Sequence, residues 1–92
     1  MDTFLQIPLR IIREQELIIG PLAWDEATKV VGLNIDRSHD SIAFDGDKKE
    51  VINRLVAQYE RIFGKASHEV CKEAVQDLIA EMPLEEVPSS LK

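Results

Sequence analysis

Cysteine is almost absent from this chain, and its scarcity limits the chemistry that the protein can perform. The 92 residues include one cysteine and two histidines. A single cysteine cannot form an intrachain disulfide, which fits a reducing compartment, so we expect a cytoplasmic protein. His68 and Cys71 lie three residues apart on one predicted helix, but a zinc site needs three or four protein ligands. We therefore expect no metal site at this pair and a Cys71 thiol packed in the core.

Positive charge is also in short supply. Eleven Lys and Arg residues against 17 Asp and Glu residues give a net charge of −6. Phosphate backbones and anionic membrane surfaces both attract basic footprints, which this chain lacks. Its apolar runs are far shorter than the ~20 residues that span a bilayer, and its first residues lack the pattern of a secretory signal. The composition predicts a soluble, acidic protein with no nucleic-acid partner and no membrane association.

Motifs of catalysis and cofactor binding are missing as well. The glycines do not form the spaced fingerprint of a dinucleotide or phosphate loop, and no nucleophile elbow occurs. The acidic cluster Asp36, Asp40, Asp45 and Asp47 fails the calcium-loop pattern, because Ser41 stands where glycine is required. Turn and capping roles explain these acids. We expect no cofactor and no catalytic residue, and an enzyme is the less favoured class.

What the sequence does contain is a pattern that occurs twice. Gly20 and Gly64, 44 residues apart, each follow one amphipathic segment and precede another. Each copy predicts a helix, a sharp stop and a second helix, since glycine accepts positive φ and Pro21 suits helix entry. Duplication of one unit explains the repeat, but helical periodicity alone would also align many of the apolar residues.

Between the two copies, residues 33–36 and 41–45 alternate between apolar and polar, and residues 37–40 supply turn chemistry. This pattern predicts a β-hairpin. Its core-facing residues are Leu33, Ile35, Ile42 and Phe44. Two strands are marginal alone, so we expect a third strand from residues 3–7 or from the hairpin of a second subunit. Pro8 favours extended geometry just before it.

The helices have clear sequence limits. The first is expected from Leu9 to Ile19 and the second over residues 21–31. Asp47 begins the third as its cap, and Ser67 begins the fourth, which continues to Met82.

The fold class that follows is α+β, with two helix-turn-helix pairs joined by a central β-hairpin. Residues 1–82 form a single small domain in this prediction. Residues 83–92 contain two prolines and little periodicity, so we expect a flexible C-terminal tail.

The first helix carries more apolar residues than one face can hold. A helix that is apolar on several sides is buried on several sides, and in a short chain a second subunit can supply one of the covering surfaces. The predicted interface consists of Leu9, Ile11, Ile12, Ile18, Ile19 and Trp24. The leading function is a small, non-catalytic protein–protein interaction or regulatory module that binds another protein or itself as a homodimer.

The alternative function is a small-molecule-binding sensor domain with an apolar pocket between helices and hairpin. Aromatic side chains would line that pocket. The candidates are Trp24, Phe44, Tyr59 and Phe63.

Overall fold

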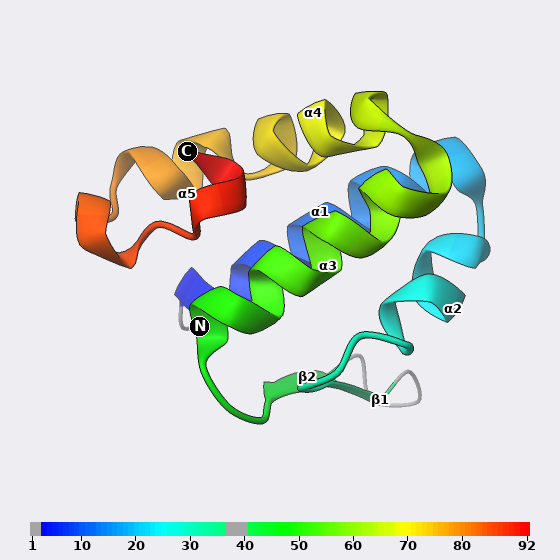
Figure 1. The fold of residues 1–92 in the computed structure, drawn as a ribbon, viewed down its shortest axis with the longest axis horizontal. Helices are drawn as coiled ribbons and strands as arrows, with labels where there is room; N and C mark the ends of the chain where they lie inside the picture. Colours follow the sequence, from blue (N-terminus) through cyan, green and yellow to red (C-terminus); the bar gives the residue numbers. More distant parts are fainter. Residues whose placement is uncertain (1–2, 37–40) are drawn as a thin grey trace.

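The computed structural model describes residues 3–36 and 41–92 (Figure 1). The elements in chain order are α1 (Thr3–Ile19), α2 (Leu22–Ala27), β1 (Leu33–Asp36), β2 (Ser41–Phe44), α3 (Lys48–Phe63), α4 (Lys65–Ala74), α5 (Gln76–Ala80) and the short 3₁₀ helices η1 (Leu84–Glu86) and η2 (Ser89–Leu91). Five α-helices and one antiparallel hairpin in the described residues confirm an α+β single small domain.

The start of α1 differs from the sequence-based expectation. The helix begins at Thr3 and contains Pro8, so the strand or arm predicted for residues 3–7 is wrong. A proline inside a helix costs about 3 kcal/mol because it lacks an N–H donor. Helical geometry buries Ile7 completely and packs Phe4 against the core. Burial of such side chains contributes about 1.5–3 kcal/mol each, which offsets the proline.

The hairpin matches the prediction in its strands and its buried face. Leu33 pairs with Phe44 and Ile35 pairs with Ile42 in an antiparallel ladder. Leu33 is buried, and the other three side chains pack against the core. The predicted turn at residues 37–40 lies outside the described residues. Contacts between β2 and α1 show that a helix, not a third strand, covers this sheet within the described residues.

The corner between α1 and α2 is formed as predicted. Gly20 has a φ of 69°, and its N–H donates to the carbonyl of Glu16 at 2.9 Å, which ends α1. Pro21 then takes the cap position of α2 with φ −57°. This corner turns the chain from the end of α1 into α2.

At the start of α3, Asp47 caps the helix as predicted. Its Oδ1 accepts from the N–H groups of Lys49 at 2.9 Å and Glu50 at 3.4 Å. The predicted cap at Ser67 is wrong, because α4 begins at Lys65 directly after Gly64 and buries Ser67 inside the helix.

The predicted fourth helix is also divided into two pieces. Val75, with φ −120° and ψ 11°, separates α4 from α5 and keeps a fully buried side chain at the break.

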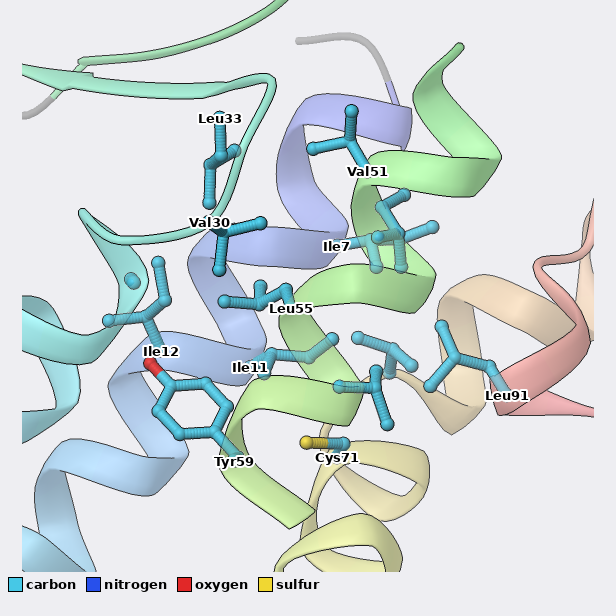
Figure 2. Packing of buried hydrophobic residues seen from close by; sticks show 14 of the residues in the cluster. Ile7, Ile11, Ile12, Val30, Leu33, Val51, Leu55, Tyr59, Cys71 and Leu91 are labelled. Atoms are coloured by element: carbon cyan, nitrogen blue, oxygen red, sulfur yellow. The ribbon is translucent and has the colours of Figure 1, made fainter. Parts of the chain in front are cut away.

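The core forms where α1, α3 and α4 meet. In Figure 1, α1 and α3 run side by side in the same direction, and α4 returns along them. Figure 2 shows Ile7 and Ile11 of α1 in one cluster with Val51 and Leu55 of α3. Helix α1 contacts α2, α3 and α4, so its neighbours are not limited to the helix that follows it in sequence.

Residues 83–92 pack against the domain, whereas their two prolines and weak periodicity predict a flexible tail. Val87 and Leu91 belong to the core cluster, and η2 contacts both α3 and α4. The N–H and Oγ of Ser90 donate to Asn53 Oδ1 at 3.1 and 2.6 Å. His68 Nε2 hydrogen-bonds the Ser90 carbonyl, so side chains of α3 and α4 both hold the segment.

Candidate functional site: the exposed end of α1 and its groove

The structure places the predicted interface residues in three different environments. Ile11 and Ile12 are fully buried, and Trp24 is nearly so. Leu9 and Ile19 are partly buried against the core, whereas Ile18 is 63% exposed.

The physical reason for this distribution is the position of α1. Helices α2, α3 and α4 and strand β2 all contact it, so the chain itself covers most of its apolar surface. Trp24 is also held inside the molecule, since its indole Nε1 donates to Glu16 Oε2 at 2.9 Å. Ile11, Ile12 and Trp24 are therefore core residues, and an interface has to use other side chains.

Large apolar side chains remain exposed where α1 ends and α2 begins. Leu17 is 80% exposed, Ile18 63% and Leu22 50%. Single exposed apolar residues are ordinary, but neighbouring ones form patches of the kind found at protein interfaces. We call these three residues the end surface.

A groove between α1 and α4 adjoins the end surface. It has a volume of about 600 Å³ and is lined by Arg10, Glu14, Ile18, Val70, Glu73, Ala74 and Asp77. The three α1 residues are four apart and occupy one stripe of their helix. On α4, Val70 precedes Glu73 by three residues and Ala74 by four, and Asp77 follows on α5. Ile18 belongs to both the groove and the end surface. Three apolar side chains, three carboxylates and one guanidinium line the groove.

Two sets of hydrogen bonds hold the walls of this groove together. Arg10 Nη1 lies 2.8 Å from Asp77 Oδ1 and 3.4 Å from the Ala74 carbonyl. The hydrogen bond from Arg10 lowers the pKa of the Asp77 carboxyl. Deeper in the molecule, Gln15 Nε2 donates to the Ser67 carbonyl at 3.0 Å, which joins α1 to the start of α4.

The His68–Cys71 pair does not form a site in this arrangement. His68 Nδ1 lies 3.0 Å from Glu60 Oε2, and Nε2 bonds Ser90. Cys71 is fully buried, as predicted, and Gln15 Nε2 lies 3.5 Å from its sulfur. Burial raises the pKa of the Cys71 thiol to about 11, which keeps it protonated and unreactive at neutral pH.

The acidic cluster of the hairpin region is only partly described. Asp40 lies outside the described residues, and Asp47 caps α3. Within residues 3–36 and 41–92, no group of three or more His, Cys, Asp or Glu side chains is placed to hold a metal ion.

The four aromatic residues of the sensor alternative have other surroundings. Tyr59 is fully buried and its hydroxyl donates to the Ala23 carbonyl, while Trp24 bonds Glu16. Phe44 and Phe63 pack against the core from its edge. None of the four lines the α1–α4 groove.

The predicted interface lacks Leu17 and Leu22 of the end surface and the α4 and α5 residues that line the groove. Leu22 follows Gly20-Pro21 and lies outside the apolar stripe of α2, so the sequence already indicates that its side chain is exposed. Arg10 and Asp77 are 67 residues apart in the sequence, so no local sequence pattern predicts their pairing.

No family model, curated protein or solved structure matches this chain. Across the described part of the chain, no helix combines the length and the apolar character needed to cross a membrane.

Proposed function

We propose that this chain is a non-catalytic, cytoplasmic protein-binding module that associates with a second copy of itself through the end surface. Its framework in this proposal is two helix pairs, α1 with α2 and α3 with α4, joined by the hairpin. The exposure of Leu17, Ile18 and Leu22 at one end of a well-covered helix is the observation that carries the proposal.

The free energy of burying exposed apolar side chains supports this proposal. A side chain of this size contributes about 1.5–3 kcal/mol when it moves from water into an apolar contact. Three such side chains at the corner between α1 and α2, one of which also lines the groove, offer a central contact of the type that dominates protein interfaces. The small-molecule sensor remains a prediction, without an observation in its favour.

Sedimentation velocity of the double variant Leu17→Ser/Ile18→Ser tests this proposal. We expect the wild type to associate as its concentration rises from about 10 to about 500 μM, a range suited to small interfaces, and the variant to stay monomeric. Leu84→Ser is the matched control, because Leu84 is 71% exposed but lies on η1. A wild type that stays monomeric throughout, or a double variant that associates like the wild type, would contradict the proposal.

A further inference from the structure

A second surface of the molecule has the opposite charge to the groove. It is a hollow of about 480 Å³ lined by Lys29, Val30, Val31, Arg54, Ala57, Gln58 and Arg61. Val31 is 75% exposed at this surface. We call it the basic face.

Two guanidiniums of the basic face, Arg54 and Arg61, form no ion pair within the described residues, although the charge of Arg61 helps to lower the pKa of Glu26. Lys29 Nζ lies 3.0 Å from Glu26 Oε2, so these two charges offset each other. Arg54 donates to the backbone carbonyl of Val31 at 3.2 Å, and Arg61 donates to the side-chain oxygen of Gln58 at 2.7 Å. Both acceptors are neutral. The guanidinium groups are thus positioned by hydrogen bonds but retain their charge.

The α1–α4 groove keeps two negative charges in the same way. Asp77 is paired with Arg10. Glu14 and Glu73 also line the groove, and neither forms an ion pair within the described residues, although the charge of Glu14 helps to raise the pKa of Arg10. One surface therefore offers two carboxylates around Ile18, and the other offers two guanidiniums around Val31.

From this complementarity we infer that the α1–α4 groove of one copy binds the basic face of a second copy, head to tail, with Val31 against Ile18. The inference rests on the proposed function and names the surface that meets the end of α1. Opposite charges across an interface select the partner surface and its orientation, while the apolar contact excludes water. In a head-to-tail dimer, one groove and one basic face remain unoccupied. Further copies can therefore add until the rotation between copies closes a ring. Association should therefore continue beyond the dimer as concentration rises.

Charge reversal on each surface tests the inference. Variant A carries Glu14→Lys and Glu73→Lys, and variant B carries Arg54→Glu and Arg61→Glu. In either variant alone, the groove and the basic face carry charges of the same sign. We therefore expect the apparent dissociation constant for self-association to rise about tenfold or more. An equimolar mixture of A and B should associate again, because the reversed groove of A fits the reversed face of B. Restoration also shows that both variants are folded.

Glu85→Lys/Glu86→Lys is the control for net charge, since it makes the same change as variant A on exposed residues of η1. This control should associate at least as well as the wild type. If A and B associate like the wild type while Leu17→Ser/Ile18→Ser is monomeric, the head-to-tail inference is overturned and the proposed function stands. If A and B are both monomeric and their mixture stays monomeric, the inference is also overturned. A wild type that never associates overturns both.

Discussion

At the scale of single residues, two glycines with the same backbone φ have different structural demands. Gly32 and Gly64 both have φ +90°. A Cβ at Gly32 would lie 2.8 Å from the Asp45 carbonyl oxygen and 2.7 Å from a methyl of Val51, whereas a Cβ at Gly64 meets nothing within 4 Å. The absence of a side chain at Gly32 therefore permits both the positive φ and the close approach of Asp45 and Val51. At Gly64 it permits only the positive φ.

Alanine at these positions should separate the two effects. We expect Gly64→Ala to lower the free energy of unfolding by about 1–3 kcal/mol, the cost of a strained backbone. Gly32→Ala should cost more, because the Asp45 backbone and the helix that carries Val51 must also shift. Urea denaturation measures both losses in free energy of unfolding, provided that the dependence of this free energy on urea concentration is the same in the variants and the wild type. Equal losses, or a larger loss at Gly64, would show that the close approach at Gly32 is unimportant.

Glu26 gives a residue-scale prediction about pH. Its carboxylate is nearly buried and accepts from Lys29 at 3.0 Å and Gln58 at 2.8 Å. The hydrogen bond from Lys29 is the main cause, and that from Gln58 the second, of a pKa of Glu26 below its ordinary value of 4.5. A lowered folded pKa means that Glu26 stabilises the fold at neutral pH and loses this contribution as pH falls through the folded value.

The stability difference between the wild type and Glu26→Gln should therefore be largest above about pH 5 and shrink toward about pH 3. Chemical denaturation across this range measures the difference. A difference that stays constant with pH, or grows as pH falls, would contradict the assignment.

At the scale of elements, the C-terminal segment acts as part of the domain. Leu91 is buried between α3 and α4, and Ser90 is held by Asn53 and His68. Leu84, earlier in the same segment, points into solvent.

We expect Leu91→Ala to reduce the free energy of unfolding by about 2–4 kcal/mol, the range for a buried leucine. Leu84→Ala, the matched control, should stay within about 0.5 kcal/mol of the wild type. Thermal and urea unfolding measure both. If Leu91→Ala is as stable as Leu84→Ala, the segment is not packed in solution, and the flexible tail expected from its prolines is the better description.

Elements with local signals could be predicted from the sequence, and those decided by distant contacts could not. The cap at Asp47, the corner at Gly20 and the hairpin strands depend on neighbouring residues, and all are present. The helical geometry before Pro8 depends on burial of side chains against α3, which no local rule contains. The same limit applies to the candidate site: Ile18 was predicted, but its groove needed the contact between Arg10 and Asp77.

At the scale of the whole molecule, the net charge of −6 conceals an uneven surface. Carboxylates collect beside the exposed end of α1, and guanidiniums collect around Val31. Copies with the same net charge repel one another at long range, but opposite patches attract at short range when salt screens the overall charge. Self-association through these patches is thus compatible with an acidic chain.

The most direct test of the central claim, that the exposed end of α1 is a binding surface, is the methyl NMR spectrum of isoleucine as a function of protein concentration. Ile18 reports the end surface, and Ile11 and Ile12 on the same helix report the core. The account predicts that the Ile18 methyl signal shifts and broadens as the protein associates, while the Ile11 and Ile12 signals keep their positions. Association that leaves Ile18 unchanged and moves the signal of Ile42 on the hairpin would contradict the account.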